Sequence, residues 1–246
     1  LLLFIFLGML FGSDGLFKIY FDNYYIAEQI CSIALIFIMF YGGFGTNWNK
    51  AKPIATKSIL LSSLGVILTS LIVGIFCHYI LKFEFLESLL IGSVISSTDA
   101  ASVFSILRSK RLNLKYNTAS LLEVESGSND PCSNIMTLVI LSFMNAQSNG
   151  SKIIYMIFSQ IVYGIIVGVV IAILSAFVLS KFKFKTDGFN SIFVFSIALI
   201  SYSLSILIGG NGYLSVYITG IILGNKNIPN KKPLVHFFDG ITGLMQ

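Results

Sequence analysis

Long apolar stretches of about 20 residues recur along this chain, and they constrain its fold more than any other feature. A helix needs that length to cross the roughly 30 Å hydrocarbon core of a bilayer. The stretches are continuous and do not alternate between polar and apolar residues, which favours helices over the strands of a membrane barrel. Charged residues make up 11% of the chain, against about a quarter in an average soluble domain. The sequence therefore predicts an all-α, polytopic membrane protein.

The hydropathy pattern predicts eight spans and the beginning of a ninth near Val235. The eight are expected at residues 1–12, 26–44, 56–81, 85–107, 116–144, 153–179, 189–208 and 213–224. The chain begins with Leu1, and its first and last spans are too short to cross a bilayer. We therefore expect a fragment truncated at both ends, in which no signal peptide can be read.

The basic residues are sorted by connection. Thirteen of the 16 Lys and Arg residues lie in every second connection between predicted spans, around residues 50–57, 108–115, 181–185 and 226–232. Cytoplasmic loops carry such an excess, so these connections are expected on the cytoplasmic side. The span at 85–107 then runs inward and the span at 116–144 runs outward. The net charge of +5 thus reflects membrane orientation, and no nucleic-acid partner is expected.

The cysteines and histidines show no metal-ligand spacing. Cys31, Cys77 and Cys132 lie in or beside spans and are interpreted as small packing residues. His78 and His236 lie near span ends and are interpreted as interfacial or packing side chains. No cofactor is expected from these residues.

A few acidic residues fall inside the predicted spans, where an ionisable group is a functional hypothesis by default. Asp99 lies near the middle of the span at 85–107, and Asp130 lies near the middle of the span at 116–144. Glu123 and Glu125 lie on the cytoplasmic side of Asp130 in the same helix. The alternative role for all four is to hold helices together through hydrogen bonds.

The residues around the two aspartates carry oxygen atoms that suit a small cation. Asp99 follows Ser96, Ser97 and Thr98, and Asp130 precedes Pro131. Because proline has no N–H, the carbonyl oxygen of the residue four positions earlier loses its helical donor. Secondary transporters place their sites at such irregular helices near the bilayer midplane.

Helical spacing separates the acids of the second span. At about 100° per residue, Ser126 shares the face of Asp130, whereas Glu125 points away from it. Glu123 returns to nearly the same face about 10 Å closer to the cytoplasm. We expect Glu123 to line an inward cavity leading to Asp130. A midplane aspartate that holds either a proton or a cation is sufficient for antiport.

At these residues the chain resembles a known family. The run from Ser96 to Ala101, the basic connection after it and the run from Leu122 to Pro131 closely resemble the NhaP-type branch of the cation:proton antiporter family, nearest the potassium/proton antiporter branch that includes cell volume regulation protein A. The resemblance extends from the segment Gly8 to Leu10 through the glycines 42 and 43 to the segment His236 to Gly240.

The resemblance implies a fold of thirteen helices in two inverted repeats, with a core domain that moves like an elevator against a dimerisation domain. Residues 54–144 would form half of the ion-transport core, residues 1–46 and 186–246 dimerisation or scaffold helices, and residues 152–181 a linker helix. Glycine pairs four residues apart permit close helix packing, and dimer packing is a further option for the first and last pairs: Gly8/Gly12, Gly164/Gly168 and Gly220/Gly224.

The resemblance also implies roles for single residues. Thr98 and Asp99 would lie in the break of the first crossing helix, and Asn129 and Asp130 would form the family's Asn-Asp pair. Asp130 would bind cation and proton alternately. By the same resemblance Ser126 is a ligand-forming serine, and Glu125 pairs with an arginine on a later helix beyond residue 246.

Two positions depart from the family pattern. Ala100 stands where many relatives have proline, and Tyr41 stands where an acid often precedes the paired glycines. An acidic contributor to the site is therefore missing, which leaves the choice between Na⁺ and K⁺ open.

The expected function is exchange of Na⁺ or K⁺ for H⁺ across a bacterial inner membrane by a homodimer that needs no cofactor and is not an enzyme. An intramembrane aspartyl protease is an alternative, since it also uses two midplane aspartates on adjacent helices. A passive cation channel is the other alternative.

Overall fold

The computed structural model describes residues 2–109, 114–145, 150–181, 187–228 and 231–245. Within these ranges the chain is helical and contains no strand. The helices are α1 (Leu2–Phe11), α2 (Tyr24–Gly45), α3 (Trp48–Ala51), α4 (Ala55–Tyr79), α5 (Phe85–Ile95), α6 (Ala100–Ser109), η1 (Lys115–Asn117), α7 (Thr118–Met144), α8 (Gly150–Lys181), α9 (Asp187–Leu207), α10 (Gly212–Asn225) and α11 (Lys231–Met245).

The predicted spans correspond closely to these helices, with one exception. The span expected at 85–107 is divided into α5 and α6 by a non-helical segment. The short helices α3 and η1 were not predicted. Among the described helices, four are long and apolar enough to cross a membrane: Tyr24–Gly45, Ala55–Tyr79, Gly150–Lys181 and Gly188–Leu207. Helix α7 has 27 residues, but its polar side chains lower its hydropathy.

Part of the charge pattern lies outside the described residues. Lys110, Arg111, Lys183 and Lys185 fall in the ranges that are not described, so the sidedness they indicate stays a prediction.

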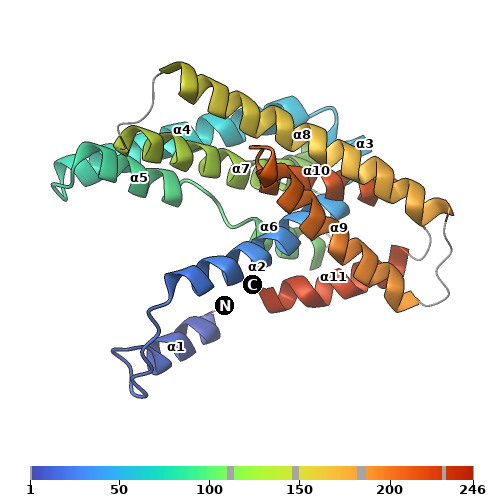
Figure 1. The fold of residues 1–246 in the computed structure, drawn as a ribbon, viewed down its shortest axis with the longest axis horizontal. Coiled ribbons are helices and arrows are strands. Elements are labelled where there is room, and N and C mark those ends of the chain that lie inside the picture. The colour runs from blue at the N-terminus through green and yellow to red at the C-terminus, as the bar shows by residue number, and fades with distance from the viewer. Residues whose placement is uncertain (1, 110–113, 146–149, 182–186, 229–230, 246) are drawn as a thin grey trace.

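Helices α4, α5 and α7 pack mainly on one another and form a first group, the polar group (Figure 1). Helix α4 buries a stripe of small residues at every fourth position, from Ser58 and Ser62 to Ser70 and Gly74. A Cβ atom on Gly92 of α5 would lie 2.3 Å from the carbonyl oxygen of Ser70. Small side chains therefore let these helices approach closely, as is typical of helices packed in membranes.

Helices α2, α8, α9, α10 and α11 form a second group, the aromatic group (Figure 1). Its core contains the fully buried Phe37, Phe40 and Phe238. The rings of Phe40 and Phe238 have centroids 5.1 Å apart, which joins α2 to α11. Aromatic pairs at this separation contribute more than their buried area alone.

Glycines bring the backbones of the aromatic group together. A Cβ atom on Gly220 or Gly224 of α10 would lie 2.4 or 2.0 Å from a carbonyl oxygen of α2. The option that this pair packs at a dimer interface is therefore wrong, because its face is covered by α2 of the same chain. Gly164 and Gly168 of α8 approach α10 in the same way.

The two groups meet around Tyr217 of α10. A Cβ atom on Gly127 of α7 would lie 2.3 Å from the ring of Tyr217. The hydroxyl of Tyr217 donates to the carbonyl oxygen of Glu123 at 3.3 Å. Nearby, the ring of Phe104 of α6 fills the space that a side chain on Gly42 of α2 would need.

Candidate ion site

The break between α5 and α6 is formed by Ser96, Ser97, Thr98 and Asp99. Side chains of these types bond to nearby backbone groups and so compete with helical hydrogen bonding. Asp99 caps the amino end of α6, because its Oδ1 accepts from the N–H of Ser102 at 3.2 Å and its Oδ2 from the Ser102 hydroxyl. Such a cap favours starting a new helix over continuing the old one. Thr98 and Asp99 thus lie in the break, where the resemblance placed them.

Helix α7 contacts this break through its Asn-Asp pair. The hydroxyl of Ser97 donates to Oδ1 of Asp130. The amide Nδ2 of Asn129 donates to Oγ1 of Thr98 at 2.8 Å. Two consecutive residues of α7 therefore bind two consecutive residues of the broken helix.

A second contact fixes the end of α5 against α7. The hydroxyl of Ser133 donates to the carbonyl oxygen of Ser93 at 2.7 Å, and the hydroxyl of Ser93 lies 3.0 Å from that of Thr137. Ser93 is fully buried, so these bonds form away from solvent. They hold the carbonyl end of α5 beside Asp130, which lies one turn earlier in α7.

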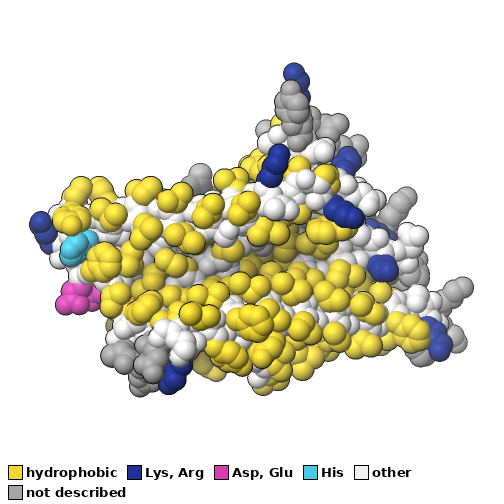
Figure 2. Space-filling model, turned by 90° about the horizontal axis from the view of Figure 1, so that it is seen from above, with side chains coloured by type: hydrophobic (Ala, Val, Ile, Leu, Met, Phe, Trp, Pro, Cys, Tyr) yellow, Lys and Arg dark blue, Asp and Glu magenta, His cyan; other side chains and the backbone are white. Residues whose placement is uncertain are grey.

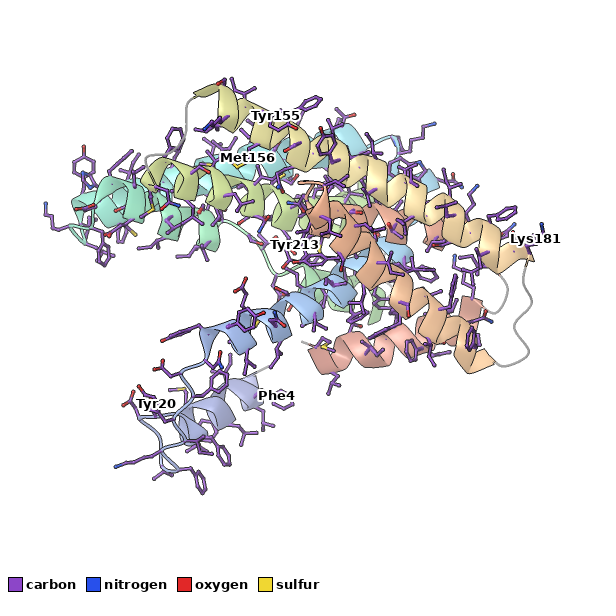
Figure 3. All side chains as sticks on the ribbon, viewed as in Figure 1. Phe4, Tyr20, Tyr155, Met156, Lys181 and Tyr213 are labelled. Carbon is purple, nitrogen blue, oxygen red and sulfur yellow. The ribbon has the colours of Figure 1, made fainter. Side chains whose placement is uncertain are left out.

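Both aspartates line one cavity of about 440 Å³. Its walls come from α2, the broken helix, α7 and α10, namely Leu35, Ile38, Val94, Ser97, Thr98, Asp99, Ala100, Asp130, Ser133, Asn134, Thr137 and Tyr213. Figure 3 shows Tyr213 near the centre of the molecule, beside the segment that joins α5 to α6. The cavity thus lies between the polar group and the aromatic group, and its oxygen atoms come from both.

Two oxygen atoms of α7, on residues that do not line this cavity, are buried without a hydrogen-bond partner in the described part of the chain. They are Oγ of Ser126 and Oδ1 of Asn129. Buried polar atoms are seldom left unpaired, and each exception calls for an explanation such as an unseen ion or water. Hydroxyl and amide oxygens are hard ligands, so both atoms fit a small cation better than an apolar contact.

The two glutamates of α7 lie outside this cavity. Oε1 of Glu125 accepts from Nδ2 of Asn129 at 3.5 Å, a bond at the limit of hydrogen-bond geometry. Glu123 is half-buried, and its carbonyl oxygen accepts from Tyr217. Every α7 residue that lines the cavity lies at or after Asp130. The roles predicted for Glu123 and Glu125 stay predictions.

Sequence reasoning missed several residues of the site. Ser97 was read only as part of a hydroxyl-rich run, although it donates to Asp130. Tyr213 gave no sequence signal because it comes from a helix more than 80 residues after Asp130. The amide link from Nδ2 of Asn211 to Oδ1 of Asn134 at 3.2 Å was also missed.

Tyr41, the residue that replaces an expected acid, has an acidic neighbour. Its hydroxyl donates to Oδ1 of Asp239 on α11 at 3.2 Å. Tyr41 is nearly buried and lies outside the cavity of Asp130. A carboxylate therefore lies beside position 41, although another helix provides it.

A polytopic helical membrane protein with a broken helix, whose non-helical segment contacts a carboxylate of the next helix, has the architecture of a secondary transporter. The similarity of this chain to known proteins supports the same class. The family model described as sodium/hydrogen exchanger, transmembrane, matches residues 1–245, and the chain belongs to that family.

The chain is similar in sequence and in structure to NhaP-type antiporters. It is 33% identical to the K⁺/H⁺ antiporter NhaP of Alkalimonas amylolytica and 33% identical to the K⁺/H⁺ antiporter NhaP2 of Shewanella baltica, in both cases over 100% of this chain and 43% of the relative. The sodium proton antiporter MjNhaP1 of Methanocaldococcus jannaschii superposes with a TM-score of 0.79 at 25% identity, covering 98% of this chain and 60% of that structure. The chain thus has the NhaP fold and spans less than half the length of these curated relatives.

Proposed function

We propose that the whole protein is a secondary antiporter, and not an enzyme, that exchanges Na⁺ or K⁺ for H⁺ at Asp130 without a cofactor. One observation carries this proposal: Asp130 and Asn129 of an unbroken helix bind Ser97 and Thr98 in the break of its neighbour. A carboxylate in a membrane span carries a free-energy cost, so its presence there indicates a functional site. Here it lies in a cavity rich in oxygen atoms and has a hydroxyl partner.

The cation would bind at Asp130, with Thr98, Ser126 and Asn129 as further oxygen ligands. The unpaired Oγ of Ser126 and Oδ1 of Asn129 support this assignment. Asp99 would contribute negative charge from the cavity wall, since Ser102 already binds both of its carboxylate oxygens. Because a proton and a cation compete for the Asp130 carboxylate, binding of one expels the other.

Alternation would come from movement between the two helix groups. Residues 54–144, which contain the polar group and α6, would form half of the moving core, and residues 1–46 and 186–246 would form the dimerisation and scaffold helices. Residues 152–181 would be the linker. The close packing within each group and the smaller contact between them support this division.

The remaining roles follow the same scheme. Glu123 would line the cytoplasmic approach to Asp130, and Glu125 would form an ion pair with an arginine beyond residue 246. The protein would act as a homodimer in the bacterial inner membrane. The two relatives compared above are named K⁺/H⁺ antiporters, and the solved structure is named as that of a sodium proton antiporter, which supports testing both ions.

The protease alternative gains no support from the site. Asp99 and Asp130 accept hydrogen bonds from different serines, Ser102 and Ser97. A shared catalytic water would require the two carboxylates to face each other.

Exchange is tested with the full-length protein in proteoliposomes that hold an acidic interior and a trapped pH dye. Addition of Na⁺ and, separately, K⁺ is expected to make the interior alkaline with at least one ion. Asp130→Asn should abolish the response, and Asp14→Asn, in an exposed turn after α1, should leave it intact. Cation flux with no proton movement would support a channel and overturn the proposal.

A further inference from the structure

A second, larger cavity shares no lining residue with the cavity of Asp130 and lies in a groove between α8 and α10. Its volume is about 530 Å³, within the usual range of ligand sites. Aliphatic side chains such as Ile165 and Val169 of α8 and Ile221 of α10 form its walls. Three residues at one end differ from the rest: Trp48, Asn225 and Lys226. The groove is therefore apolar along its length and polar at one end.

The polar end is built by a specific set of hydrogen bonds. Oδ1 of Asn225 accepts from the backbone N–H of Trp48 at 2.9 Å, and Nδ2 of Asn225 donates to the carbonyl oxygen of Thr46 at 2.8 Å. These two hydrogen bonds tie the amino end of α3, which begins at Trp48, to the last turn of α10. Trp48 is thereby held at the mouth of the groove, with 40% of its surface exposed.

The mouth carries positive charge. Lys226 lines it directly, and Lys50, Lys52 and Lys57 follow Trp48 along the chain. The segments 45–57 and 224–228 contain no acidic residue. Figure 2 shows one face of the molecule, on which hydrophobic side chains cover most of the surface; several Lys and Arg side chains lie toward one end, and others lie at the opposite end.

The dimensions of the groove match one leaflet of a bilayer. From Ile218 to Lys226 α10 advances by about 12 Å, close to half of the roughly 30 Å hydrocarbon core. Tryptophan and lysine are the side chains that mark the membrane interface. The apolar part would then lie at acyl-chain depth and Lys226 at headgroup depth.

We propose that this groove binds one anionic phospholipid, with an acyl chain between α8 and α10 and its phosphate at Lys226. Basic pockets between membrane helices on the cytoplasmic side are suited to such headgroups. A soluble anion would match the charge of Lys226 but would leave the aliphatic part of the groove unfilled. The site is separate from the cavity of Asp130 and does not depend on the proposed exchange.

Trp48 provides the test, because it is the single tryptophan of this 246-residue chain. The full-length protein is reconstituted in phosphatidylcholine vesicles that contain a small fraction of brominated phosphatidylglycerol or, separately, brominated phosphatidylcholine. Bromine quenches tryptophan fluorescence on contact, and subtraction of a Trp48→Phe variant isolates the signal of Trp48. We expect phosphatidylglycerol to bind about fivefold better than phosphatidylcholine, the preference that one interfacial lysine provides.

Lys226→Gln should remove that preference, whereas Lys152→Gln, which removes an exposed lysine at the other end of α8, should retain it. Equal quenching by the two lipids, or a preference that survives Lys226→Gln, would overturn the anionic site. Absence of quenching by either lipid would show that protein covers the groove and would also overturn the proposal.

Discussion

The polar group and the aromatic group are stabilised by different kinds of side chain, although both consist of membrane helices. The buried face of α4 contains mostly serine and glycine, and Ser93 and Ser133 join α5 to α7. The aromatic group also buries serine, threonine and glycine residues on α10, but the centre of its core is formed by large side chains, with Phe40 and Phe238 among them. Close backbone approach at glycines and buried hydrogen bonds occur in both groups, so the groups differ in the size of their core side chains, which are small in the polar group and large and aromatic in the other.

This difference explains where the candidate site lies. A broken helix leaves polar backbone groups that must find partners inside the bilayer. Serine and threonine hydroxyls of the polar group provide such partners at Ser93 and Thr98. The aromatic group contributes Tyr213 to the cavity wall and few polar groups besides. Small polar packing thus accommodates a break and a carboxylate, whereas aromatic packing supplies a stable support.

The largest predicted loss of stability is in the aromatic group. Phe238→Ala should lower the free energy of unfolding by about 3–5 kcal/mol, because it leaves a cavity beside Phe40. Phe158→Ala removes the same ring from a position that is 55% exposed and should change stability little. The melting temperatures of the full-length variants in detergent check this, and equal shifts for the two would contradict the assigned core.

Gly92→Ala tests the close approach in the polar group. The new Cβ atom would lie 2.3 Å from the carbonyl oxygen of Ser70, and relief of that clash should cost about 1–3 kcal/mol. Gly65→Ala in α4 is the matched control, since no atom lies within 4 Å of its Cβ position. If thermal unfolding showed the two variants to be equally stable, α4 and α5 would not be packed as described.

Two substitutions of Asp99 separate the effect of its charge from its effect as the cap of α6. Asp99→Ala removes the cap of α6 and should cost about 1 kcal/mol, whereas Asp99→Asn keeps a capping oxygen and should cost only a few tenths. Both variants remove the charge and should weaken apparent cation affinity in the vesicle assay. A destabilised Asp99→Asn with normal affinity would limit Asp99 to a structural role.

The smallest effect is expected for a single hydrogen bond between helices. Ser133→Ala removes the donor to Ser93 and should cost about 0.6 kcal/mol, the average for such bonds in a membrane. Ser196→Ala is the control, because that hydroxyl is exposed and bonds within its own helix. A melting temperature unchanged from that of the control would show that the serine contacts do not stabilise the polar group.

The sequence predicted the spans well because hydropathy alone determines which segments enter a bilayer. It predicted the position of the break only through the resemblance, since Ser96 to Asp99 contain neither glycine nor proline. Contacts between distant helices were not predictable, because the link between Ser97 and Asp130 has no characteristic spacing. The dimer option for Gly220 and Gly224 failed for the same reason. The spacing of these glycines shows that one face of the helix carries small residues, but it does not show which helix packs on that face.

The central claim is that one carboxylate, Asp130, binds either a cation or a proton. The most direct measurement is proton release from the purified full-length protein in weakly buffered detergent when Na⁺ or K⁺ is added. Wild-type protein should release protons with the transported ion, and Asp130→Asn should release none while remaining folded. Equal proton release from Asp130→Asn would contradict the claim and place the exchange at another group.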